Sequence, residues 1–507
     1  MSERLRRIAI RGFTIFSPQD WSTPAVEWYL IAIWALWVCQ AYLNLDPRVV
    51  PGGGEFLSVI QSHHLWTRFQ ACGWCALWDG SQGGGYPAFA ETLGSPLHPL
   101  VILTTWWFGV IDGAKLSLVG AIFLGGIAQW WLGRELGVGW LPRMWGACMA
   151  IVAGHLAGKI ENGNFGLVLA MAMAALTLAP SFWLARTGSY RAMVALAVTA
   201  ALLAVAGQGY VQVAMAFMIP TYVVLIDGSP AGAKPALLRF LGAAVLAILL
   251  ASPFLVPLAH FLPNLVKETD PFFVASQPLP YYLLNLFIDD REFLASTLLG
   301  KLPYPYMYNL FVGWIPVGFA VMCLALARAK DGLALFFLAC YAGFAILLGS
   351  LLPFKWLAPL IPALTGMRFA PFVGAIAIPA ILGLATFGLD RLLKLEWPQF
   401  VIADRQGKRV RGLSLDLKWI FILPVLFVAL RQGYDFSQLW IYPVRLEDDI
   451  YTTVQALKTV DLQWVEPPFG EHKYIEPAIG AGLKLSPGIL PYSWKDRAAP
   501  LPFLEAN

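Results

Sequence analysis

Long apolar segments follow one another from residue 26 to residue 431 with few interruptions. A helix of about 20 apolar residues crosses the ~30 Å hydrocarbon core of a bilayer. Because lipid offers no hydrogen-bond partners, a crossing segment must satisfy its own backbone, and a helix does so. The apolar segments lie at 26–44, 97–111, 115–133, 143–157, 165–185, 191–206, 210–226, 237–262, 310–327, 333–352, 369–389 and 417–431. The sequence therefore predicts an all-α polytopic membrane protein.

The composition supports this class and excludes others. Only 13% of the 507 residues are charged and 58% are hydrophobic, whereas a soluble chain carries about 25% charged residues. The net charge is +4, and the basic residues lie at the ends of the apolar segments. Membrane topology explains this placement better than nucleic-acid binding does. We expect membrane lipids, and no nucleic acid, among the partners. The basic N-terminus precedes an uncleaved first span rather than a signal peptide.

The basic residues also predict which loops face the cytoplasm, because cytoplasmic loops are enriched in Lys and Arg. Their alternation is satisfied by about eleven crossings, with the N-terminus inside and the C-terminus outside. This solution requires that 97–111 does not cross by itself; its Pro96 start favours an interfacial or re-entrant helix. The alternative is a conventional span there and one further span, which gives thirteen crossings.

This topology divides the chain into two parts. Residues 1–432 form the transmembrane domain, with a first extracytoplasmic loop at 45–96 and a second long outer loop at 263–309. Residues 433–507 form a short extracytoplasmic C-terminal segment. The chemically informative polar residues gather in the outer loops, so a reaction site at the outer membrane surface is expected there.

Two acids of the first loop are candidate catalytic groups. Glu55 follows three glycines that allow a ligand to approach the backbone closely, and Asp46 follows the first span directly. A carboxylate at this boundary can deprotonate an acceptor hydroxyl or hold a metal on a phosphate. The alternatives are a solvated loop acid for Glu55 and an Asp-Pro turn for Asp46.

The next polar group of the loop suits an anion. Arg68 can contact a phosphate through two parallel hydrogen bonds, and His64 can orient or bind the same group. The alternative is a polar helix face at the level of the lipid headgroups. Tyr86 lies between two Gly- and Pro-rich passages that return the chain to the membrane.

Cys72 and Cys75 form a C-x-x-C pair downstream of two histidines. With His63 and His64 they make weak candidates for a four-ligand zinc site. Outside the cytoplasm the same cysteines can instead form a disulfide or a redox pair. The sequence leaves these alternatives open.

The second outer turn is unusually polar for a short connection between spans. It holds His155, Lys159 and Glu161, and ionisable groups at this depth are candidates for function. Lys159 can pair a phosphate, or simply pair Glu161. Gln208, on the next outer turn, can bind a sugar or hold two helices together. Arg368, where an outer loop enters a span, requires an anionic partner, either a lipid-linked phosphate or a nearby group.

Together these residues resemble the GT-C superfamily of polyprenyl-phosphate-dependent glycosyltransferases. The nearer resemblance is to the bacterial YfhO-type and 6-pyruvoyl-tetrahydropterin-synthase-related membrane proteins. The matching residues are Glu55, His64, Arg68, Trp78, Gly84-Gly85-Tyr86-Pro87, Pro96-Leu97 and Met367-Arg368-Phe369. Two features depart from the family: its first-loop acid is usually Asp, and this chain has no Asp-x-Asp pair.

The resemblance implies a GT-C-like bundle of about 11–13 helices in the inner membrane of a bacterium. It implies a membrane glycosyltransferase that moves a sugar from a polyprenyl-phosphate donor to an acceptor on the outer face. Glu55 would be the base and Asp46 its reserve, with Arg68, Lys159 and Arg368 neutralising the donor phosphate. A divalent cation, Mg or Mn, is a possible cofactor.

Two other classes of function remain open from the sequence. One is a non-catalytic scaffold that has kept the fold and works with partner subunits in a larger membrane complex. The other is a transporter of lipid-linked sugars, which requires a polar path through the bilayer. Few ionisable residues lie at mid-span, so the transporter is the less favoured of the two.

Overall fold

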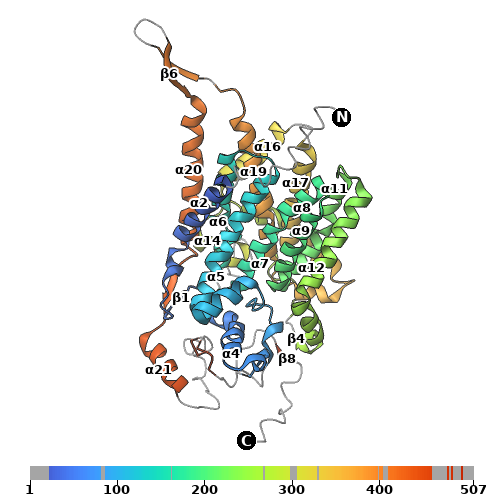
Figure 1. The fold of residues 1–507 in the computed structure, drawn as a ribbon, viewed down its shortest axis with the longest axis vertical. Helices are drawn as coiled ribbons and strands as arrows, with labels where there is room; N and C mark the ends of the chain where they lie inside the picture. Colours follow the sequence, from blue (N-terminus) through green and yellow to red (C-terminus); the bar gives the residue numbers. More distant parts are fainter. Residues whose placement is uncertain are drawn as a thin grey trace, which may run out of the picture.

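The computed structural model of the protein is a bundle of helices (Figure 1). It describes residues 22–80, 86–161, 163–266, 269–296, 305–327, 331–397, 399–403, 409–459, 477–478, 481–483 and 493–494. Within these residues, seven helices are long and apolar enough to cross a membrane, and three shorter apolar helices accompany them. The prediction of an all-α polytopic membrane protein is confirmed. The number of crossings and the sides of the termini remain predictions.

A helix covers each of the apolar segments found in the sequence. The helices of the bundle are α2 (Ser22–Val38), α5 (Pro99–Glu135), α6 (Trp140–Val152), α7 (Phe165–Leu176), α8 (Leu178–Thr187), α9 (Tyr190–Val205), α10 (Gly209–Met218), α11 (Val223–Asp227), α12 (Ala233–Phe261), α16 (Trp314–Leu326), α17 (Gly332–Gly349), α19 (Ala377–Leu393) and α20 (Leu417–Gln438).

Short elements fill the connections between these helices. The helical ones are η2 (Gln40–Leu43), α3 (Phe56–Val59), η3 (Ile60–His63), α4 (His64–Cys72), η4 (Gly73–Leu77), η5 (Ala88–Ala90), η6 (Ala157–Lys159), η7 (Ile219–Tyr222), η8 (Leu262–Asn264), α13 (Leu279–Leu284), α14 (Arg291–Ala295), α15 (Pro305–Tyr308), α18 (Leu352–Leu357), η10 (Pro362–Gly366), η11 (Ala370–Ile376) and α21 (Asp448–Thr459). The strands are β1 (Val49–Pro51), β2 (Trp78–Asp79), β3 (Tyr86–Pro87), β4 (Leu265–Val266), β5 (Gln399–Ala403), β6 (Arg409–Asp416), β7 (Pro443–Arg445) and β8 (Ser493–Trp494).

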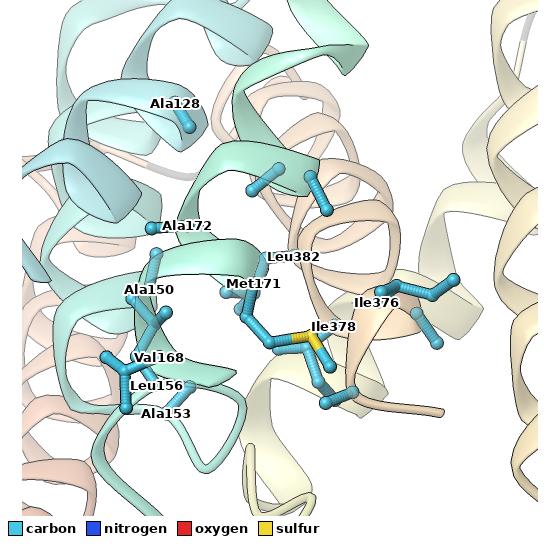
Figure 2. Packing of buried hydrophobic residues seen from close by; sticks show 14 of the residues in the cluster. Ala128, Ala150, Ala153, Leu156, Val168, Met171, Ala172, Ile376, Ile378 and Leu382 are labelled. Atoms are coloured by element: carbon cyan, nitrogen blue, oxygen red, sulfur yellow. The ribbon is translucent and has the colours of Figure 1, made fainter. Parts of the chain in front are cut away.

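The centre of the bundle is formed by α7 and α19. Every residue of α7 is buried. The most apolar 18-residue stretch of the candidate span Ala370–Leu393, which includes α19, is buried as well. Figure 2 shows how small and branched side chains from α5, α6, α7 and α19 pack together there. Close packing of this kind stabilises helices in a membrane, where burial from water contributes nothing between spans. By contrast, only 22% of the apolar window of α12 is buried, so this helix lies at the periphery.

A glycine allows one of the closest helix contacts. A Cβ atom at Gly388 of α19 would lie 2.0 Å from the carbonyl oxygen of Phe319 in α16. Any side chain at residue 388 would therefore push the two helices apart. Small residues at helix contacts serve the same purpose in other membrane proteins.

Helix α5 is a hairpin of two helical pieces. Its backbone turns at Gly109, where φ is 76° and ψ is −175°, a conformation that glycine adopts easily. The hydroxyl groups of Thr104 and Ser117 lie 2.6 Å apart, so the first piece runs back along the second. The expectation that 97–111 does not cross the membrane by itself stays a prediction.

The C-terminal segment packs back against the first loop. Strand β7 pairs antiparallel with β1, and Val50 lies opposite Val444. The pairs β2–β3, β4–β8 and β5–β6 are also antiparallel and two-stranded. In Figure 1, β1, α4, α21 and β8 lie at one end of the bundle and β6 lies at the other. The first loop and the C-terminal segment, expected to share the outer face, therefore share one end.

Candidate functional site

A cavity of about 670 Å³ lies where β1 and α3 face the C-terminal segment. Among the described residues, four polar side chains line it, two on each wall. Glu55 and Ser58 belong to the first loop, and Arg445 and Glu447 belong to the C-terminal segment. The rest of the wall is largely apolar, with Val50, Phe56, Leu57, Val444, Leu446 and Ile450 among its residues.

Glu55 is placed at this cavity by its position just before α3. It is the N-cap residue of that helix, and its side chain does not cap the helix. The Ser58 hydroxyl donates a hydrogen bond of 2.9 Å to the Glu55 carbonyl oxygen, which fixes the backbone of the turn. The residue is exposed. The candidate base of the sequence analysis therefore does line a hollow at the expected end of the bundle.

Arg445 is the cation that the sequence analysis missed. Strand pairing between β1 and β7 brings it to the cavity from a segment almost 400 residues away along the chain. Its guanidinium lies 3.1 Å from the carboxylate of Asp448, and both side chains are more than half exposed. Such surface pairs contribute about 0–1 kcal/mol. The cation can therefore exchange Asp448 for a phosphate at small cost.

Asp46 is not placed to act as the reserve base. Its carboxylate accepts hydrogen bonds from the backbone N–H and the guanidinium of Arg48, the shortest of them 2.7 Å. These bonds lower the pKa of Asp46 to about 2, which makes it a weak base near neutral pH. Asp46 is also not among the residues that line the Glu55 cavity. Its role in the structure is to hold Arg48.

Arg68 lines a second cavity, of about 580 Å³. One of its guanidinium nitrogens, Nη1, lies 2.5 Å from the buried carboxylate of Asp79. Among the described residues, no hydrogen bond is made by its other nitrogens. An arginine held at one edge and open at the other is suited to a phosphate. The two cavities share a wall formed by Leu57, Leu446 and Pro477.

His64 and Tyr86 lie close to Arg68. His64 lines the second cavity, with its ring against Gly482 of the C-terminal segment. Tyr86 is buried and hydrogen-bonds to Asp79, and burial raises the pKa of its hydroxyl well above the usual value. Tyr86 therefore supports the Arg68–Asp79 pair rather than facing a cavity. Gly84 and Gly85 of the same motif lie outside the described residues.

The zinc site proposed for the C-x-x-C pair is not formed. Cys72 and Cys75 are joined in a disulfide and are exposed. His63 points elsewhere, because its Nε2 lies 2.6 Å from the Gly94 carbonyl oxygen. No group of three His, Cys, Asp or Glu side chains in the described part of the chain could hold a metal ion. The disulfide alternative is the one that the structure contains.

The polar turn between α6 and α7 is buried, which was not expected. Lys159 is fully buried and donates a hydrogen bond of 3.4 Å to the Met307 carbonyl oxygen. Burial lowers its pKa to about 7, although the charge of Glu161 opposes this. Glu161 itself lies 3.3 Å from Arg291. None of these groups lines the Glu55 cavity.

The other three predicted ligands also lie away from the Glu55 cavity. His155 is buried. Gln208 is buried and donates a hydrogen bond of 3.2 Å to the side-chain oxygen of Asn164, which is the helix-joining alternative. Arg368 stacks over the ring of Phe369 at 4.3 Å. The structure therefore does not bring Lys159 or Arg368 to the candidate base.

A buried acid, Glu91, joins two parts of the first loop to each other and was also missed. Its carboxylate accepts hydrogen bonds from the backbone N–H groups of Leu93 and Gly94 and from the hydroxyl of Ser62. Burial nevertheless raises its pKa. Since all of these partners belong to the first loop, we assign Glu91 a structural role.

The stability of the protein should fall as the pH is lowered from about 6.5 toward 4. Burial lowers the pKa of His63 to about 4, so between these values the unfolded chain binds a proton that the folded chain does not. The shift corresponds to at most about 3 kcal/mol. Thermal unfolding across this range should show a steeper loss for the wild type than for His63→Gln, in which the amide can still reach Gly94. If both proteins lost stability equally with falling pH, His63 would not be neutral in the folded protein. Glu91, whose raised pKa has the opposite effect on stability, is present in both proteins, so its effect cancels in the comparison.

The chain was compared with families, curated proteins and solved structures. No family model matches it, and no curated protein matches it. It is similar to the crystal structure of ArnT from Cupriavidus metallidurans in the apo state, with 14% identity, a TM-score of 0.33, and coverage of 73% of this chain and 78% of that one. The same protein bound to undecaprenyl phosphate gives 13% identity, a TM-score of 0.34, and coverage of 84% and 90%.

Proposed function

We propose that this chain is a membrane glycosyltransferase that transfers a sugar from a polyprenyl-phosphate donor to an acceptor at the outer membrane face. The observation that carries the proposal is the Glu55 cavity. It places a carboxylate and a guanidinium on facing walls of one largely apolar hollow. A carboxylate can take a proton from an acceptor, a cation can neutralise a phosphate, and an apolar wall can contact a prenyl chain.

The chemistry is a single displacement with inversion. Glu55 accepts the proton of the acceptor hydroxyl as its oxygen attacks the anomeric carbon of the sugar. The bond between that carbon and the phosphate oxygen breaks, and the electron pair leaves with the polyprenyl phosphate. Arg445 stabilises the charge that develops on the leaving phosphate. In the part of the chain that the structure describes, no three acids or histidines gather at this cavity, so its residues do not fit a divalent cation.

The second cavity extends the site. It places Arg68 and His64 on the other side of Leu57, two residues from Glu55. We propose that the donor phosphate lies at the boundary of the two cavities, with Arg68 on one side and Arg445 on the other, and that the acceptor occupies the Glu55 side. Arg68 and His64 therefore keep the donor-binding role expected from the sequence. Arg445 takes the role of neutralising the phosphate that was expected for Lys159 and Arg368.

Binding of a polyprenyl monophosphate to the purified protein tests the proposed site. We expect Arg68→Ala and Arg445→Ala each to weaken binding at least about tenfold, since one charge-assisted hydrogen bond is worth about 1.5–3 kcal/mol. Native mass spectrometry or retention of a radiolabelled lipid measures this. Arg186→Ala is the matched control, because Arg186 pairs with Glu135 at a distance from either cavity.

Unchanged binding in both cavity variants would contradict the proposed site. It would favour the second candidate, a non-catalytic scaffold subunit. One observation supports that candidate: Lys159, which was expected to neutralise the donor phosphate, is buried and hydrogen-bonded within the protein itself. A scaffold should purify with a stoichiometric partner subunit and bind no polyprenyl phosphate.

A further inference from the structure

Lys115 lies in a site made of oxygen atoms that neither the resemblance nor the proposed function uses. Its side chain is 1% exposed. The ammonium donates hydrogen bonds of 2.5, 3.0 and 3.0 Å to the carbonyl oxygens of Asn44, Asp46 and Val49. A carboxylate oxygen of Asp112, three residues earlier in α5, lies 2.6 Å away. Four oxygen atoms therefore surround one buried cation.

The four oxygen atoms come from two separate parts of the chain. The three carbonyl groups belong to the first six residues after η2, where the first loop leaves the bundle. Asp112 and Lys115 belong to the second piece of α5, just after its turn at Gly109. Carbonyl and carboxylate oxygens are the ligands that proteins offer to hard metal cations. Here the ammonium group of Lys115 occupies the space among these four oxygen atoms.

The site lies directly before the wall of the Glu55 cavity. Val49, whose carbonyl oxygen is the last of the three, is the first residue of β1. Val50 and Pro51, which follow it, line the cavity. The Asp46–Arg48 ion pair belongs to the same segment of the chain. The ammonium therefore holds residues 44–49 in place, and with them the start of β1.

We propose that Lys115 is the resident cation of a four-oxygen site, and that it positions the start of the first loop on α5. Without the ammonium, three carbonyl groups and a carboxylate face one another with no donor between them. A buried polar group that loses its partner is strongly disfavoured. The site should therefore accept a small alkylammonium ion when the lysine is shortened. The consequence for sugar transfer rests on the proposed function, whereas the cation site itself does not.

Chemical rescue tests the proposal. Lys115→Ala removes three carbons and the ammonium, and n-propylammonium has this same composition. We expect the purified variant to unfold at a lower Tm than the wild type, and added n-propylammonium to restore the lost Tm with saturation. Neutral 1-propanol should not restore it. Lys115→Met, which fills the space without a charge, should keep a low Tm at every concentration.

A matched control is available in Lys394. This lysine pairs with Asp390 but its side chain is half exposed, so Lys394→Ala should show no saturable response. The proposal is overturned if Lys115→Ala does not respond, if the wild type responds equally, or if Lys115→Met is as stable as the wild type. If Lys115→Ala does not fold, acetylation of the wild-type protein tests the proposal instead. We expect Lys115 to stay unmodified while Lys394 reacts. Equal reaction of the two lysines would overturn the proposal. These readouts do not depend on transfer, so a failure here is distinct from a failure at Glu55.

Discussion

Replacing Glu55 by Gln should lower sugar transfer by at least about 100-fold, because a general base contributes about 10²–10⁴ to the rate. The amide keeps the size of the side chain but cannot take the proton of the acceptor. Glu55 is exposed at the start of α3 and does not cap that helix, so folding should be unaffected. Transfer is measured with the purified protein in liposomes that contain a polyprenyl-phosphate-linked sugar.

Two control variants separate the loss of a base from the loss of charge. Glu447→Gln removes a carboxylate from the opposite wall of the same cavity and should reduce transfer much less than Glu55→Gln. Glu396→Gln changes an exposed acid beyond the end of α19 and should have no effect. Membrane insertion and gel filtration should be unchanged for all three. Transfer near the wild-type rate in Glu55→Gln would remove Glu55 from the reaction.

The sequence was sufficient to predict the helices and the location of the candidate base. Apolar runs of membrane-spanning length fold as helices whatever their neighbours are, and helices lie over all of these segments. Glu55 was singled out because its signal is local: an acid that follows three glycines in the loop after the first span. Its role as the base stays a prediction. The turn of α5 at Gly109 was not predicted.

The cations of the site could not be predicted, because their placement depends on contacts between distant segments. Arg445 reaches the cavity only through the pairing of β1 with β7, and three-residue strands leave no recognisable pattern in the sequence. The polarity of its turn made Lys159 a candidate phosphate ligand, yet residues 305–312 cover that turn and bury it. Polarity alone does not distinguish a solvated turn from a buried one that is bonded to the backbone.

Removing Glu27 should destabilise the protein by about 3–5 kcal/mol, the cost of breaking a buried ion pair. This carboxylate of α2 is 1% exposed. It lies 2.6 Å from Nη2 and 2.9 Å from Nε of Arg143 in α6, and it accepts a hydrogen bond from the indole of Trp130. Glu27→Ala would leave a partly buried guanidinium between helices without its counter-charge. The change is measured as the unfolding free energy in mixed detergent micelles.

The double variant Glu27→Ala/Arg143→Leu shows whether the uncompensated charge causes the loss. Replacing both partners by apolar groups removes the charge along with its partner, so much of the stability should return. An exposed pair provides the scale: Asp435→Ala breaks the contact with Arg431 and should cost less than about 1 kcal/mol. If the double variant were less stable than Glu27→Ala, the favourable term would be the packing of the arginine side chain against Trp130, whose ring lies 5.8 Å from the guanidinium. The pair would then hold α2 to the bundle through that packing rather than through its charge.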